Sequence, residues 1–254
     1  MPDKPANFAV DATLVSNFTH QIINPLNGVV GTLDNVIDGT TAGAKRDQRL
    51  RAVRAQLEHV IELVRNLAFL TNLSTEAGRE SLRKTGGTCL VPELIIEAAM
   101  YFQETAQERG MKIELGDSAT QYVVNGQRDL LRQVFANLLE NAVKYGEDGS
   151  RVDVVTRGQK GTDQLIVEVI NRGPGFKYDD RERIFERGVR GAEAKEIYAS
   201  GSGLGLFICR QILDHAFDAK IEAEHSPATG LSTFRIRFPS YRVDQTVRRS
   251  YGQR

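Results

Sequence analysis

The sequence predicts an α+β protein of two parts, a pair of long helices followed by a domain in which helices alternate with strands. In the first part, apolar residues recur every three or four positions over residues 10–38 and again over 44–74. In the second part, residues 90–240, segments with helical periodicity alternate with short segments typical of strands. An all-helical start followed by this mixture indicates two domains.

Composition and charge limit the functions that this chain can have. A hydrophobic content of 41% and a charged content of 26% are typical of a soluble globular protein. The 33 basic residues balance the 33 acidic residues, so net charge does not favour nucleic acid as a partner. No apolar run reaches the roughly 18 residues of a membrane span, and no signal pattern is present, so we expect a cytoplasmic chain without a membrane segment. Cys89 and Cys209 lack metal-site spacing and are expected to be reduced and packed as small apolar residues.

The two N-terminal helices are predicted to form a hairpin. The glycine-bearing segment 39–43 is expected to be the turn between them. Each helix carries an apolar stripe too long to be left in water, so we predict that two hairpins pair as a dimeric four-helix bundle. The alternative is a monomeric hairpin folded against the rest of the chain.

The second part contains a regular succession of predicted elements. A polar linker is expected over 75–89 and a basic tail over 241–254. Helices are predicted at 91–110, 127–146 and 204–217, and strands at 111–115, 121–125, 151–157, 164–170, 220–225 and 231–238.

His20 lies on a small polar face of the first predicted helix. Asn24, Asn27 and Gly28 share this face with it, because helical residues three and four apart are neighbours. Pro25 removes one backbone hydrogen bond and tends to bend the helix just after His20. The imidazole is therefore open to approach by a second protein, although a solvated helix histidine would give the same pattern.

Three motifs of the second part suggest a phosphate ligand. In NLLENAVKY, residues 137–145, Asn137 and Asn141 are one helical turn apart, and Lys144 lies one step further along. Amide oxygens suit Mg²⁺ and a lysine ammonium suits phosphate. The motifs NRGPGF at 171–176 and GSGLGL at 201–206 are glycine-rich, and the latter opens a helix whose N–H groups favour anions. Taken singly, each motif is also explained by solvated amides or a flexible loop.

Taken together, these motifs resemble a known family. FTHQIINPL, residues 18–26, resembles the H-box of two-component sensor histidine kinases. The three later motifs resemble, in order, the N, G1 and G2 boxes of the nucleotide-binding fold shared by histidine kinases, DNA gyrase, heat-shock-90 chaperones and MutL proteins. RIFERGVRG at 183–191 resembles the kinase F-box. The resemblance covers about residues 10–240. It implies a phosphotransfer and dimerisation hairpin over 10–74 and, over 90–240, an ATP-binding α/β two-layer sandwich whose mixed sheet is backed by helices.

The resemblance implies roles for the residues that match the N-box. Asn137 and Asn141 would line the Mg²⁺–triphosphate site, with Asn141 as the metal ligand. Lys144 would contact phosphate, and Tyr145 would lie beside the nucleotide.

The glycine-rich motifs would supply the other side of the nucleotide site. Asn171 would meet the adenine amino group, with Gly173 and Gly175 shaping the adenine pocket. The phosphates would be held at the base of a lid, residues 176–202, by Gly201, Gly203, Leu204 and Gly205. The lid would also contain Phe185, Arg187 and Arg190, and either arginine could pair with phosphate or be a solvated charge.

Two residues depart from the family pattern. Gln21 stands where the residue after the phosphorylated histidine is usually acidic, and an amide cannot take up a proton. General-base assistance is worth about 10²–10⁴ in rate, so autophosphorylation is expected to be slow. Asn171 replaces the adenine-binding aspartate, which predicts a loss of about 1 kcal/mol of binding free energy, or about five-fold in nucleotide affinity.

Asn24 occupies the Thr/Asn position that, in the family, helps to orient the water that hydrolyses the partner's aspartyl phosphate.

The sequence therefore predicts an ATP-dependent autokinase that is phosphorylated on His20 and passes the group to an aspartate of a response regulator receiver domain. The alternative is a phosphatase or relay module that uses nucleotide only as a conformational ligand, which Gln21 and Asn171 would favour. A gyrase-type ATPase is disfavoured because Asn137 stands where those proteins carry a catalytic glutamate. Fewer than 20 residues precede His20, so the input is expected from a longer chain or from a partner.

Overall fold

The computed structural model describes residues 12–39, 43–83, 86–116, 121–158, 164–191 and 203–243. The chain divides into two compact units, Met1–Ser81 and Leu82–Arg254, and each is described here by itself. The first is helical and the second contains a mixed sheet covered by helices, which confirms the predicted α+β class. The division falls inside the segment predicted as a linker.

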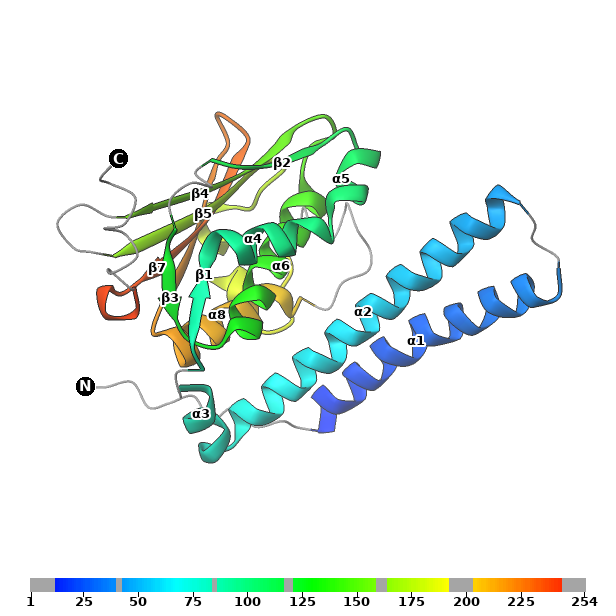
Figure 1. Cartoon of the computed structure of the whole chain (residues 1–254), viewed down its shortest axis with the longest axis horizontal. Coiled ribbons are helices and arrows are strands. Elements are labelled where there is room, and N and C mark those ends of the chain that lie inside the picture. Colours follow the sequence, from blue (N-terminus) through cyan, green and yellow to red (C-terminus); the bar gives the residue numbers. More distant parts are fainter. Residues whose placement is uncertain are drawn as a thin grey trace. The chain divides into compact units, whose positions relative to one another are not determined.

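The first unit contains the predicted pair of helices. Helices α1 (Ala12–Ile37) and α2 (Ala44–Ser74) pack along each other, as Figure 1 shows. A short third helix, α3 (Glu76–Arg83), occupies most of the segment expected to be an irregular linker. It forms because the hydroxyl of Thr75 accepts a hydrogen bond from the Gly78 N–H at 3.0 Å, capping the first turn.

The apolar stripes of the hairpin are only partly covered. Phe18 of α1 and Leu63 and Leu70 of α2 are at most 2% exposed. By contrast, Val30 and Ile37 of α1 are 57% and 78% exposed, and residues of α2 such as Val64 are also open. Packing α1 on α2 thus leaves these side chains outside the contact between the two helices.

The second unit is built on a five-stranded sheet with the order β2-β4-β5-β7-β6. Only the β2–β4 pairing is parallel, which makes the sheet mixed. Two further strands, β1 and β3, pair separately. The strands are β1 (Thr88–Leu90), β2 (Lys112–Leu115), β3 (Val123–Asn125), β4 (Arg151–Gly158), β5 (Leu165–Arg172), β6 (Lys220–Ser226) and β7 (Leu231–Phe238).

One layer of helices covers one face of this sheet. Figure 1 shows α4, α6 and α8 gathered on the same side, where they meet strands β2, β5 and β6 respectively. The buried side chains of β5, such as Val167 and Val169, alternate with Glu168, which pairs with Arg157 and Arg235 on the other face. The result is the expected two-layer sandwich. Its helices are α4 (Val91–Met100), α5 (Gln103–Glu108), α6 (Arg128–Tyr145) and α8 (Gly205–Phe217).

Two predicted boundaries in this unit are wrong. The helix expected over 91–110 is interrupted after Met100, because the N–H groups of Tyr101 and Phe102 bond to carbonyls three residues back and tighten the last turn. The packed chain also extends past residue 240, where a tail was expected. Val243 is buried and pairs with Val124, while Arg242 forms a 2.7 Å ion pair with Asp218.

The burial of both cysteines predicts that neither thiol reacts in the folded protein. Cys89 and Cys209 are 0% exposed, and burial raises the pKa of the Cys89 thiol to about 11. At pH 8 only about one Cys89 thiol in a thousand would be the reactive thiolate, even if reagent reached it. A disulfide-exchange reagent should therefore label neither cysteine until guanidinium is added. A Ser240→Cys variant, which adds an exposed thiol, should be labelled at once; rapid labelling of the parent chain would contradict the buried positions.

Candidate nucleotide-binding site

The first and third motifs meet where α6 packs beside α8. Asn137 is 2% exposed, and its side-chain N–H donates to the Gly205 carbonyl at 3.3 Å, across 68 residues of sequence. Leu204, directly before α8, is also buried. The Asn137 amide is therefore not a solvated helix amide. It joins α6, which carries the first motif, to the first residue of α8, the helix that the third motif opens.

The last turns of α6 bring three polar side chains to the same region. Asn141, Lys144 and Tyr145 are each half-buried, and the Lys144 ammonium lies 5.6 Å from the centre of the Tyr145 ring. Asn141 follows Asn137 by one turn, so their amides share one face of α6. This face offers an amide oxygen and a positive charge, the groups that a metal-bound phosphate requires.

The second motif lies against the end of α6. Asn171 is buried at the end of β5, with its side-chain N–H 3.4 Å from the Arg172 carbonyl. A Cβ atom at Gly173 would lie 2.3 Å from the Tyr145 carbonyl oxygen, so only glycine allows this approach. The Gly173 N–H donates to the Gly230 carbonyl at 2.9 Å. The chain that carries Asn171 is thus held directly beside the residues that follow Asn141.

His225, which the sequence analysis did not single out, supports this loop. Gly175 has φ of +68°, and a Cβ atom there would lie 2.1 Å from Nδ1 of His225. The same nitrogen lies 3.0 Å from the buried Ser232 hydroxyl, and the Phe176 ring packs near the imidazole. His225 and Ser232 are neighbours across the β6–β7 hairpin, and β6 reaches the 171–176 loop only in the folded sheet, so no local motif reveals the role of His225.

The segment expected to form a lid is described over residues 176–191. Within it, Phe185 is 1% exposed, with the Arg210 guanidinium of α8 4.2 Å from its ring centre, so this side chain packs against α8. The Gly188 N–H donates to the Gly203 carbonyl at 3.1 Å, and Gly203 has φ of +65°. Arg187 and Arg190 are half-buried. Gly201 lies outside the described residues.

The H-box residues lie on α1, in the other unit. His20 and Asn24 are exposed and one turn apart on α1. The Oε1 atom of Gln21 is shielded from solvent, and within the described part of the chain no group, the His20 ring included, donates a hydrogen bond to it.

The sequence of this chain is similar to that of a known protein family. Residues 126–242 match the family of histidine kinase-, DNA gyrase B- and HSP90-like ATPases. The signal transduction histidine-protein kinase BaeS of Escherichia coli (strain K12) is 30% identical over 220 residues, which are 86% of this chain and 44% of BaeS.

Solved structures show the same fold. The histidine kinase AdeS of Acinetobacter baumannii superposes with a TM-score of 0.58 and 20% identity, over 87% of this chain and 98% of that one. The histidine kinase ThkA, solved in complex with the response regulator TrrA, gives 0.55 at 17% identity, over 90% of this chain and 61% of that one.

Residues 126–242, with the motifs of α6, the 171–176 loop and α8, are an ATPase domain of this family. The chain has the catalytic core of a two-component sensor histidine kinase. It spans less than two thirds of the length of the curated relatives it matches. Among the helices that the structure describes, none combines the length and apolar character needed to cross a bilayer.

The close approach at Gly173 predicts a specific loss of nucleotide binding. Gly173→Ala would force the 171–176 loop away from the Tyr145 carbonyl and should weaken Mg·AMPPNP binding about ten-fold, equivalent to about 1.4 kcal/mol. Titration calorimetry measures this directly. Gly116→Ala is the matched control, because its added Cβ would meet only ordinary contacts of 3.6 Å or more. Equal affinities for the two variants would contradict the assignment of this loop to the site.

Proposed function

We propose that this chain is an ATP-dependent protein histidine autokinase that phosphorylates His20 and passes the phosphoryl group to an aspartate of a response regulator receiver domain. The observation that carries the proposal is the convergence of the three motifs in one unit. Asn137 bonds to Gly205 at the start of α8, and Gly173 lies against Tyr145 at the end of α6. A nucleotide bound among these elements would be held by both glycine-rich segments and by the polar face of α6.

The donor atoms near α6 suit Mg²⁺ bound together with a nucleotide. In the described ranges, no group of three or more His, Cys, Asp or Glu side chains could hold a metal by itself. Mg²⁺ usually keeps waters and substrate phosphate oxygens as ligands and takes only one or two from the protein. Asn141 would supply its amide oxygen, and Mg²⁺ would neutralise part of the phosphate charge. Lys144 would add a positive charge on the same side, and Asn171 would accept a hydrogen bond from the adenine amino group.

The transfer step requires an accessible imidazole. A ring nitrogen of His20 would form a bond to the γ-phosphorus while the bond to the leaving ADP oxygen breaks, and the ring proton would pass to water. The exposure of His20 on α1 favours this step. Gln21 cannot accept the proton, so His20 would react without a base at the next position.

A specific observation favours the phosphatase alternative. Asn24 is exposed one turn from His20, where its amide could hold a water, whereas Gln21 cannot act as a base for the imidazole. The chain would then bind nucleotide without labelling His20 and would remove phosphate from a phosphorylated receiver domain. Asn24→Ala should abolish that removal if this function is the true one.

Autophosphorylation tests the proposed function. The parent chain incubated with γ-labelled Mg·ATP should acquire acid-labile, alkali-stable label, and His20→Ala should acquire none. His215→Gln, which removes an imidazole from the far end of α8, should keep the label. Gln21→Glu restores a possible proton acceptor and should raise the rate about ten- to a hundred-fold. Nucleotide binding without label in the parent would reject the kinase and select the alternative.

The exposed stripe of the hairpin predicts a homodimer. Val30 and Ile61 are 57% and 49% exposed, and pairing two hairpins into a four-helix bundle would remove them from water. Sedimentation should give twice the chain mass of 28.2 kDa for the parent. The double variant Val30→Glu/Ile61→Glu should sediment as a monomer, whereas Lys45→Glu, at another exposed position of α2, should remain dimeric. A monomeric parent would contradict the predicted bundle.

A further inference from the structure

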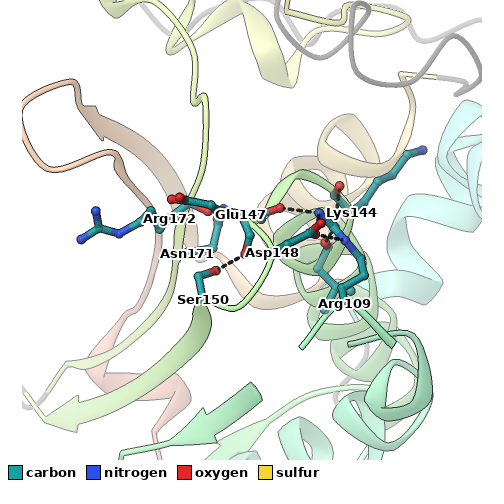
Figure 2. A network of polar contacts seen from close by, with 9 residues as sticks. Arg109, Lys144, Glu147, Asp148, Ser150, Asn171 and Arg172 are labelled. Carbon is teal, nitrogen blue, oxygen red and sulfur yellow. Dashed lines mark hydrogen bonds and ion pairs between the residues drawn. The ribbon is translucent and has the colours of Figure 1, made fainter. Parts of the chain in front are cut away.

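Arg109 lies directly after α5, and its side chain donates hydrogen bonds to several backbone carbonyls at the end of α6. Its guanidinium donates to the carbonyls of Val143, Lys144 and Gly146, the last two at 3.1 and 2.7 Å. It also forms an ion pair of 2.6 Å with Asp148. Figure 2 shows these contacts converging on one side chain.

These carbonyls belong to the C-terminal end of α6. The last four carbonyls of a helix have no partner within it, and they form the negative end of its dipole. Such an end disfavours a bound anion unless positive charge compensates it. Arg109 supplies that charge and also supplies hydrogen bonds to two of the four carbonyls, those of Val143 and Lys144.

The turn that Arg109 stabilises also holds the end of β5. The Glu147 N–H donates to the Arg172 carbonyl at 2.8 Å, and the Ser150 hydroxyl donates to the Glu147 carbonyl at 2.6 Å. The Gly149 N–H donates to the carbonyl of Arg109 itself at 2.9 Å. Asn171 lies next to Arg172 in this network, as the labelled residues of Figure 2 show. The end of α6 and the chain entering the 171–176 loop are therefore joined through one turn.

We propose that Arg109 is a positioning residue for nucleotide binding, which fixes Lys144 and Asn171 relative to each other by holding the turn between α6 and β4. The inference rests on the proposed function. Arg109 acts through backbone groups, since its donors are engaged by the carbonyls and by Asp148. Its planar fork reaches acceptors in several directions at once, which a lysine ammonium on a flexible stem does not reproduce.

The test compares nucleotide affinity with folding stability in matched arginine variants. Arg109→Gln removes the contacts to α6. Arg242→Gln is the control, because it removes the ion pair with Asp218, which lies at the opposite end of α8 from Gly205. The Arg242 side chain is 11% exposed and the Arg109 side chain is 25% exposed, so both arginines are largely buried. For each folded protein, calorimetric titration with Mg·AMPPNP at low temperature gives the dissociation constant, and thermal unfolding gives the melting temperature.

We expect Arg109→Gln to bind Mg·AMPPNP about ten-fold more weakly than the parent, the scale on which loss of a supporting group usually weakens a site. Arg242→Gln should have a lower melting temperature and an unchanged dissociation constant. A merely structural role for Arg109 would give the same pattern as Arg242→Gln, and that result would overturn the proposal.

A second variant covers the case in which Arg109→Gln does not fold. Arg109→Lys keeps a cation at the end of α6 but loses the fork, and we expect affinity weakened about three-fold, between the parent and the glutamine variant. Parent-like affinity in Arg109→Lys would overturn the proposal. Absence of Mg·AMPPNP binding in the parent chain would reject the proposed nucleotide site itself. That result differs from a failure of the role given to Arg109, in which the parent chain binds and the variants bind equally well.

Discussion

The carbonyl groups at the C-terminal end of α6 have no partners within the helix, and other parts of its unit pack against them. Arg109 bonds to the carbonyls of Val143 and Lys144, while Gly173 lies against the carbonyl of Tyr145. A buried carbonyl without a partner costs free energy comparable to a lost hydrogen bond. Arg109, directly after α5, meets part of this need, and the loop after β5 packs closely against the same helix end at Gly173, so three segments distant in the sequence meet there. The residues proposed to bind nucleotide at this end lie on two of these segments, α6 and the 171–176 loop.

The other end of the site depends on a different contact. Asn137 commits one amide hydrogen to the Gly205 carbonyl and thereby joins the middle of α6 to the first residue of α8. Leu204 is buried directly before that helix start, and Phe185, from an earlier segment, is buried beneath the Arg210 guanidinium of α8. Two short motifs thus bound the site along α6. In the hairpin, by contrast, the packing of α1 on α2 leaves part of the apolar surface outside the contact between the two helices.

Much of this organisation could be predicted from local patterns in the sequence. The apolar periodicity located α1, α2, α6 and α8, and the order of the motifs identified the fold, because each depends on residues close together in the chain. Arg109 and His225 were not found, since Arg109 bonds to a carbonyl 37 residues away and His225 packs against Gly175, on a separate segment of the chain. Phe185 was expected in the lid, but its burial against α8 is a tertiary effect that the motif does not reveal. The shielding of the Gln21 Oε1 atom from solvent likewise depends on packing within the folded chain.

The central claim is that the end of α6, the 171–176 loop and the start of α8 form one nucleotide-binding site. Hydrogen exchange of the parent chain, with and without Mg·AMPPNP, tests this most directly. The account predicts that the nucleotide slows amide exchange in residues 141–147, 171–176 and 203–208 together, while the β1–β3 pair is unchanged. Protection confined to one of these segments, or spread equally over β1 and β3, would contradict it.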